Sequence, residues 1–225
     1  MRSQLDKWLT TTLLKPIIGW YLRKDRWYRH PLLSQGLLVK AGVFHPSFFF
    51  SSEFFADFAN RQLVMDKRVC EMGAGSGLLS FLMLQKGAVV TSIERSQVAL
   101  SGLLFNKQHC NCPERLSIVA SDMFDAVNEP PFDFIFINPP YFFKSPATEV
   151  QLAWYAGPSG EFFDRFFSQL KKQVHAQSQI YMVLADNCDL AAIENIASVH
   201  KWQMKVVYSR KIRWEINSIF QISPQ

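Results

Sequence analysis

The chain has 225 residues and a net charge of +5, with 48% hydrophobic and 19% charged residues. These values suit one globular α/β domain with short additions, and no run reaches the roughly 18 apolar residues that a membrane-spanning helix needs. A secretory signal is not expected, because Asp6, Lys7 and Lys15 interrupt the first apolar stretch. Four cysteines do not make a disulfide framework at this length. We therefore expect a cytoplasmic protein with free thiols and no integral membrane association.

The first 30 residues account for the whole net charge, with seven basic residues against two acidic ones. Tryptophan and tyrosine are interleaved with the basic residues in an amphipathic, helical pattern. Such a segment indicates a phosphate-bearing partner such as nucleic acid, or an anionic surface, although a solvated helix explains the pattern equally well. Residues 36–50 look β-rich, with a turn at Ala41 and Gly42. Residues 1–50 are therefore predicted to form an N-terminal extension of helix and hairpin.

Strands and helices alternate through the predicted main domain, residues 51–225. A helix is expected over 52–63, where Phe54, Phe55 and Phe58 fall on one face. The strands expected beyond it are 68–72, 88–94, 115–122, 132–138 and 179–185, and the helices are 76–86, 96–108, 160–174 and 189–200. Residues 202–221 alternate as two antiparallel strands. This order predicts a mostly parallel sheet with helices on both faces.

A glycine-rich turn follows the first strand of this domain and opens the next helix, as in a nucleotide-binding loop. Its GxGxG spacing has Leu78 where the dinucleotide fingerprint requires glycine, so NAD is disfavoured, and no Gly-Lys-Ser/Thr follows, so a P-loop is excluded. The carboxylate two residues before the first glycine favours a cationic ligand. A tight turn without a ligand is the alternative. The candidate ligand-binding residues are Glu71, Gly73, Ala74, Gly75 and Gly77.

The next two strands also end in acidic residues. Glu94, followed by Arg95, ends the second strand about twenty residues further on, where an acid can accept both hydroxyl protons of a ribose. Asp122 ends the third strand, where it can accept a hydrogen bond from an adenine amine while Met123 packs on the ring. Ligands of open α/β sheets bind at the carboxyl ends of strands. Three consecutive strand ends with such residues therefore predict one binding site.

The fourth strand runs into an Asn-Pro-Pro-Tyr turn at residues 138–141. Here the chain resembles the class I methyltransferases that carry an NPPY motif, which include the HemK-like glutamine methyltransferases and the exocyclic-amine methyltransferases of adenine and guanine. The resemblance runs from about Val69 to the C-terminus and rests on the glycine-rich turn, the two strand-end acids and the NPPY turn, in this order. It implies a Rossmann-like, doubly wound sheet of seven strands with an antiparallel last strand. It also implies S-adenosylmethionine as the cofactor.

The chemistry of the NPPY turn suits a planar amine or amide nitrogen. Two consecutive prolines fix the backbone and remove two N–H donors. The side-chain oxygen of Asn138 and the carbonyl of Pro139 can each accept one proton of an NH2 group, and Tyr141 can stack on the flat group. Alignment and electrostatics can supply most of the rate, because a sulfonium leaving group needs no strong base. The catalytic candidates are Asn138, Pro139, Pro140 and Tyr141, and Asn138 is also a cofactor candidate.

The resemblance leaves the substrate open. HemK-like enzymes have a separate helical substrate domain before the catalytic one, and this chain has too few residues there for it. The basic, aromatic N-terminus therefore favours an exocyclic amine of a nucleobase, in RNA before DNA. The alternatives are a protein glutamine amide, a small molecule, and a non-catalytic cofactor-binding subunit of a methyltransferase complex.

Two further signals receive less weight. His109, Cys110 and Cys112 crowd together without a second cluster of matching spacing, so no metal site is predicted. The resemblance places residues 45–52 over the cofactor, and Phe48 or Phe50 is expected either to cover the adenosine or to belong to the core.

Overall fold

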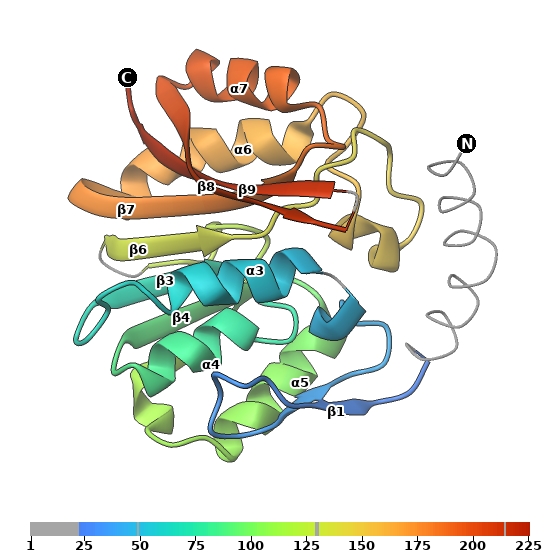
Figure 1. The fold of residues 1–225 in the computed structure, drawn as a ribbon, viewed down its shortest axis with the longest axis vertical. Helices are drawn as coiled ribbons and strands as arrows, with labels where there is room; N and C mark the ends of the chain where they lie inside the picture. The colour runs from blue at the N-terminus through green and yellow to red at the C-terminus, as the bar shows by residue number, and fades with distance from the viewer. Residues whose placement is uncertain (1–22, 49, 129–130, 214) are drawn as a thin grey trace.

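The computed structural model describes residues 23–48, 50–128, 131–213 and 215–225. A sheet of seven strands crosses the molecule, with helices on both of its faces (Figure 1). The strands are β3 (Arg68–Met72), β4 (Val89–Glu94), β5 (Leu116–Ala120), β6 (Phe132–Ile137), β7 (Val174–Ala185), β8 (Trp202–Ile212) and β9 (Glu215–Pro224). They lie in the order β5-β4-β3-β6-β7-β9-β8.

The sheet is parallel from β5 to β7, and β9 runs antiparallel to both of its neighbours, β7 and β8. This confirms the expected Rossmann-like sheet with an antiparallel last strand. The chain builds outward from β3 to β5 and then returns to place β6 on the other side of β3. The point at which the strand order reverses therefore lies between β3 and β6, where open α/β sheets bind their ligands.

Five α-helices among the described residues cover the sheet: α3, α4 and α5 lie on one face, and α6 and α7 lie on the other (Figure 1). They are α3 (Phe50–Ala59), α4 (Leu78–Gln85), α5 (Gln97–Gln108), α6 (Glu161–Leu170) and α7 (Leu190–Val199). Short 3-10 turns occur at η2 (Pro46–Phe48), η3 (Pro113–Arg115), η4 (Glu149–Ala153) and η5 (Lys171–Gln173). In the part of the chain that the structure describes, no helix is long and apolar enough to cross a membrane.

Each face of the sheet has its own hydrophobic core. One core joins α3 and α4 to the sheet around Phe54, Phe55 and Leu82, and the other joins α6 and α7 around Phe163 and Phe166. Seven of the twelve largest fully buried side chains are phenylalanines. The high phenylalanine content therefore mainly reflects packing on both faces of the sheet.

The N-terminal hairpin differs from the expectation in its position. It pairs β1 (Arg26–Tyr28) with β2 (Leu37–Val39), so its first strand falls in the segment predicted to be helical. The turn expected at Ala41 and Gly42 is present, and the Val43 N–H donates to the Lys40 carbonyl across it at 3.1 Å, but this turn follows β2 and does not connect the two strands. The helix prediction was wrong there because Tyr28 is 5% exposed whereas Trp27 is 62% exposed, the two-residue alternation of a half-buried strand. The rest of the predicted N-terminal helix, residues 1–22, lies outside the described residues.

A buried asparagine joins the hairpin to helix α5 of the main domain. Asn106 on α5 is 2% exposed, and its Oδ1 accepts a hydrogen bond from the Leu38 N–H at 2.8 Å. Its Nδ2 donates to the Leu38 carbonyl at 3.0 Å. One amide thus satisfies both backbone groups of Leu38 on the strand that leads toward residues 41–44.

Candidate active site

The register of the sheet brings the predicted site residues to one edge. Met72 pairs with Ile93 of β4 and with Ile137 of β6, so these three strands end level with one another. Gly73, Glu94 and Asn138 directly follow Met72, Ile93 and Ile137 in the sequence. Residues far apart in the sequence therefore meet at the carboxyl end of the sheet.

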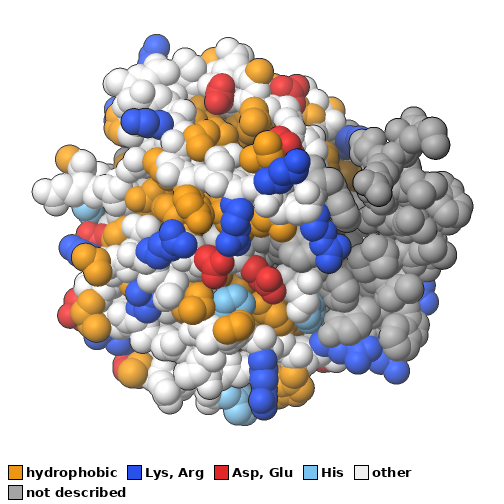
Figure 2. All heavy atoms as spheres, in the orientation of Figure 1, with side chains coloured by type: hydrophobic (Ala, Val, Ile, Leu, Met, Phe, Trp, Pro, Cys, Tyr) orange, Lys and Arg blue, Asp and Glu red, His pale blue; other side chains and the backbone are white. Residues whose placement is uncertain are grey.

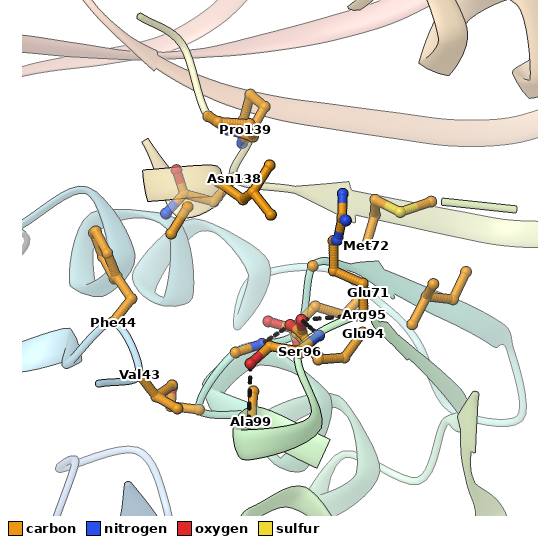
Figure 3. Close-up of a pocket in the computed structure, with 18 of the residues that line it drawn as sticks. Val43, Phe44, Glu71, Met72, Glu94, Arg95, Ser96, Ala99, Asn138 and Pro139 are labelled. Atoms are coloured by element: carbon orange, nitrogen blue, oxygen red, sulfur yellow. Dashed lines mark hydrogen bonds between the residues drawn. The ribbon is translucent and has the colours of Figure 1, made fainter. Parts of the chain in front are cut away.

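A cavity of about 360 Å³ opens at this edge, within the size range of ligand pockets. In Figure 3, Asn138 and Pro139 lie toward one end, Glu94 and Ser96 lie toward the other, and Phe44 lies along one side. Twelve of the thirteen predicted site residues line the cavity: Glu71, Gly73, Ala74, Gly75, Glu94, Arg95, Asp122, Met123, Asn138, Pro139, Pro140 and Tyr141. Gly77 is the one that does not.

The glycines of the loop have two different tasks. Gly73 has a φ of +68°, and a Cβ there would meet nothing within 4 Å, so the backbone is open to a ligand. Gly77 has a φ of +80°, and a Cβ there would lie 2.6 Å from Cδ2 of Leu103. Glycine at position 77 therefore permits close packing of α4 against α5, whereas Gly73 leaves free space over the loop.

Glu71 is a buried acid with an elevated pKa. Its Oε2 accepts hydrogen bonds from both the backbone N–H and the hydroxyl of Ser80 on α4, and Ser92 donates in turn to the Ser80 hydroxyl at 2.6 Å. Burial raises the pKa of Glu71 to about 7, although the bonds from Ser80 oppose this shift. A cation in the cavity would favour the ionised carboxylate. Neither serine was identified from the sequence.

Glu94 organises the loops on either side of it. Its Oε2 accepts the Gly75 N–H at 2.8 Å, and its Oε1 accepts the N–H groups of Arg95 and Ser96, each at 2.8 Å. An ionised carboxylate has about four acceptor positions, so capacity remains for a ligand hydroxyl. Ser96 also caps α5 through Ala99.

Asp122 lines the cavity between two arginines. Its Oδ2 accepts a hydrogen bond from Nη1 of Arg165 at 2.6 Å, and its Oδ1 lies 3.4 Å from Nη1 of Arg95. Arg95 lines the cavity, whereas Arg165 on α6 does not. Met123, the next residue, is 6% exposed and has a φ of +54°. Arg165 was not identified from the sequence, because its contact with Asp122 spans 43 residues.

The NPPY turn places the side-chain amide of Asn138 at the cavity. Among the described residues, none forms a hydrogen bond with the side chain of Asn138, which is partly exposed at the cavity. Burial raises the pKa of Tyr141 to about 12, so its hydroxyl stays protonated at any ordinary working pH. The turn is braced by the next residues, because Phe142 accepts the Ala156 N–H at 2.9 Å and donates to the Trp154 carbonyl at 3.1 Å.

An aromatic pair that was not expected lines one side of the cavity. Phe44 and Trp154 have ring centroids 5.2 Å apart, and both line the cavity. They come from the segment after the hairpin and from the loop after the NPPY turn. The expectation for Phe48 and Phe50 stays untested, because their side chains lie outside the described residues.

The histidine and cysteines near the end of α5 make local contacts. His109 Nδ1 lies 2.8 Å from the Phe105 carbonyl, and the Cys110 thiol donates to the Lys107 carbonyl at 3.1 Å. Over the described ranges, no group of three or more His, Cys, Asp or Glu side chains could hold a metal ion.

Comparison with known proteins agrees with this geometry. The family model of the methyltransferase small domain matches residues 36–201. A tRNA1(Val) (adenine(37)-N6)-methyltransferase of Shewanella halifaxensis is 28% identical over 147 residues, which are 63% of this chain and 59% of that protein. The same-named protein of Shewanella amazonensis is 37% identical over 84 residues, 36% of each chain. The chain thus spans less than two thirds of the length of these curated relatives.

Solved structures share the fold at low sequence identity. The 16S rRNA N2 G1207 methyltransferase of T. thermophilus, in complex with AdoMet and guanosine, aligns with a TM-score of 0.59 and 19% identity over 88% of this chain and 50% of that chain. The Mtq2–Trm112 complex of E. cuniculi, which methylates the termination factor eRF1, aligns with a TM-score of 0.59 and 19% identity over 82% of this chain and 99% of that chain. The family match covers well over half of the sequence, and the chain therefore belongs to the methyltransferase small domain family.

Proposed function

We propose that the protein is an S-adenosylmethionine-dependent N-methyltransferase that acts on an exocyclic amine of a nucleobase in RNA. The observation that carries this proposal is that the Asn138 side-chain amide has no hydrogen-bond partner among the described residues and lines the same cavity as the glycine-rich loop. A methyl donor and a flat acceptor amine can meet only where these two elements share one space. The register of β3 with β6 supplies that arrangement.

The donor set of the cavity fits S-adenosylmethionine. Gly73 and Gly75 offer open backbone for the methionine half, with Ala74 between them, and the Glu71 carboxylate favours its ammonium and sulfonium charges. Glu94 retains acceptor capacity for ribose hydroxyls. The residues assigned to the adenine side of the site are Asp122, Met123 and Arg95. When bound, this cofactor supplies an electrophilic methyl group.

The acceptor nitrogen is held by the NPPY turn. The Asn138 Oδ1 and the Pro139 carbonyl each accept one N–H of the amine, which directs the nitrogen lone pair into the cavity. Pro140 keeps the turn rigid. Tyr141 stacks on the base as a neutral ring, since its pKa of about 12 keeps it protonated. No residue of the turn acts as a strong base.

Three observations favour RNA as the substrate class. The first curated relatives are named as enzymes of adenine N6 in a tRNA. Figure 2 shows Lys and Arg side chains across the middle of one face, where α3 and the β8–β9 hairpin lie in Figure 1. The exposed basic residues in and next to these elements include Arg61, Lys205, Arg210 and Lys211. The basic N-terminal segment adds further positive charge. Phosphate backbones are bound through such charge.

The test is methylation of purified tRNA with a labelled cofactor, followed by digestion and mass analysis of the nucleosides. We expect N6-methyladenosine, and an Asn138→Ala protein should lose at least about a hundredfold in rate while binding S-adenosylhomocysteine within about threefold of wild type. Asn111→Ala, at an exposed loop position away from the cavity, is the matched control. Full activity of Asn138→Ala would refute the mechanism.

The same assay, run with a release factor as well as with tRNA, separates the alternatives. Methyl transfer to a glutamine of a release factor, with tRNA unmodified, would favour a protein amide as substrate. Cofactor binding without transfer to any substrate would favour a non-catalytic subunit. Binding of tRNA should weaken steeply between 50 and 200 mM salt, because each phosphate contact releases counterions.

A further inference from the structure

The loop that contains Asp122 has a backbone that needs external support. Met123 adopts a φ of +54°, a region that a residue with a side chain rarely occupies and that costs on the order of 1 kcal/mol. Within the loop, the Ser121 hydroxyl accepts the Ala126 N–H at 2.9 Å. This bond alone does not orient the Asp122 side chain, which is 38% exposed.

Helix α6 supplies the external support through two side chains. Gln169 accepts the Phe124 N–H at 3.2 Å and donates to Oδ1 of Asp125 at 2.7 Å. Arg165, one turn earlier, donates to the Asp122 carboxylate at 2.6 Å and to the Asp122 carbonyl at 3.2 Å, and it also bonds the carboxylate of Asp125. The guanidinium therefore holds the side chain and the backbone of the same residue, a geometry for which the planar fork of arginine is suited.

A second arginine, Arg95, competes for the Asp122 carboxylate. Arg95 lies on the cavity side of Asp122, with its Nη1 3.4 Å from Oδ1. Without Arg165, the carboxylate would be free to turn and pair with Arg95 through both oxygens. It would then no longer present an oxygen toward a ligand, because that oxygen would be engaged by the guanidinium.

We propose that Arg165 is a positioning residue that fixes the Asp122 carboxylate to accept a hydrogen bond from the 6-amino group of the cofactor adenine. The inference rests on the proposed function, because it assigns the adenine side of that site. Arg165 does not line the cavity, so it acts only through Asp122 and the loop backbone. A surface ion pair with one contact contributes little to stability, but a fork that holds side chain and carbonyl together constrains a direction.

The experiment compares two ligands by titration calorimetry on the full chain. One is S-adenosylhomocysteine, and the other is the same molecule with unsubstituted purine in place of adenine, which lacks only the 6-amino group. Wild type should bind the first about tenfold to a hundredfold more tightly, as expected for a hydrogen bond to a charged acceptor. In Arg165→Ala this ratio should fall below about threefold, through weaker binding of the adenine ligand alone. A merely structural role would weaken both ligands in parallel and would overturn the proposal.

Four further proteins complete the design. Asp122→Ala should lose the same discrimination, and Asp122→Ala/Arg165→Ala should bind no more weakly than Asp122→Ala, because Arg165 then has no carboxylate to orient. Ser168→Ala, at an exposed position on the same helix, is the matched control and should retain a ratio of at least tenfold. Arg165→Lys keeps the charge but not the fork, and we expect an intermediate ratio. It decides the question if Arg165→Ala does not fold.

The outcomes separate the two proposals. If wild type binds neither ligand, the proposed function fails together with this inference. If wild type binds and discriminates but Arg165→Ala and Arg165→Lys discriminate equally well, the cofactor assignment stands and the role of Arg165 is refuted.

Discussion

Gly75 donates its backbone N–H to Oε2 of Glu94 at 2.8 Å, and this bond ties the glycine-rich loop to the end of the neighbouring strand. The other carboxylate oxygen accepts two further backbone N–H groups, those of Arg95 and Ser96. Glu94 is only 8% exposed. One buried side chain therefore sets the relative position of two loops that line the cavity, in addition to its proposed contact with ribose.

Replacing Glu94 with glutamine should weaken both the protein and its cofactor binding. The amide NH2 of Glu94→Gln cannot accept, so at least one of the three backbone N–H groups loses its partner, at a cost of about 1–3 kcal/mol in the free energy of unfolding. Affinity for S-adenosylhomocysteine should fall at least about tenfold. Urea denaturation and calorimetric titration measure these effects, with the exposed Glu114→Gln as control. Unchanged stability would show that the hydrogen bonds to Glu94 carry no net energy.

The elevated pKa of Glu71 predicts a pH-dependent difference in stability. The unfolded chain loses this proton near pH 4.5, whereas the folded protein keeps it to about pH 7, because the carboxyl group is buried. The folded state thus binds more protons within this window, so the contribution of Glu71 to stability is full below pH 4.5 and is lost as the pH rises through 7. Relative to Glu71→Gln, wild type should lose roughly 3 kcal/mol in the free energy of unfolding across the window. Denaturant titrations of both proteins at several pH values measure it, and parallel curves would contradict the shift.

Cofactor binding should also depend on Glu71, but it should favour the ionised form of this residue, whereas folding favours the protonated form. A ligand with ammonium and sulfonium charges favours the ionised carboxylate, so affinity for S-adenosylmethionine should rise between pH 6 and 8, by up to about tenfold per pH unit below the pKa. The ligand's own amine titrates identically with either protein. Any pH dependence of the affinity that wild type shows and Glu71→Gln lacks is therefore due to Glu71. Equal pH dependence in the two proteins would show that Glu71 does not contact the cofactor.

Alanine substitutions should separate the two kinds of glycine in the loop. Gly77→Ala places a Cβ 2.6 Å from Leu103 and 2.8 Å from Phe81, so we expect a loss of about 2 kcal/mol or more in the free energy of unfolding. Gly73→Ala meets no atom within 4 Å and should cost only the strain of its positive φ, about 1 kcal/mol, while it blocks the cofactor. Thermal unfolding and ligand titration of both variants test this, and the reverse ranking would refute the assignment.

Asn106→Ala should loosen the attachment of the hairpin to helix α5. The substitution leaves the N–H and carbonyl of Leu38 without the partners that they have at 2.8 and 3.0 Å, at an expected cost of about 2–4 kcal/mol in the free energy of unfolding. Asn106→Asp is the matched variant, because it keeps the acceptor for the N–H but faces the carbonyl with a second acceptor. We expect hydrogen exchange at Leu38 to accelerate in both. Unchanged protection would mean that strand pairing alone holds the hairpin.

Local patterns explain why the main domain was predictable. From residue 52 onward every expected strand and helix is present, with shifted ends; β7, for example, begins at Val174 rather than at 179. The glycine-rich turn, Glu94 at the end of β4 and Asp122 two residues beyond β5 are recognisable because each lies at the carboxyl end of an apolar strand. The hairpin was not predictable in the same way, since the segment around Trp27 and Tyr28 suits a helix as well as a strand, and contacts with the core decide between them.

The sequence by itself determined the order of strands and helices, the residues that end each strand, and hence which side chains gather at the carboxyl edge of the sheet. Only the tertiary structure decided how those side chains are held: Ser80 against Glu71, Arg165 against Asp122, and Phe44 against Trp154. It also decided that Gly77 packs against Leu103 instead of facing the cavity. The physical reason is that strand and helix signals arise from neighbours within a few positions, whereas these contacts join segments whose separation in sequence carries no periodicity.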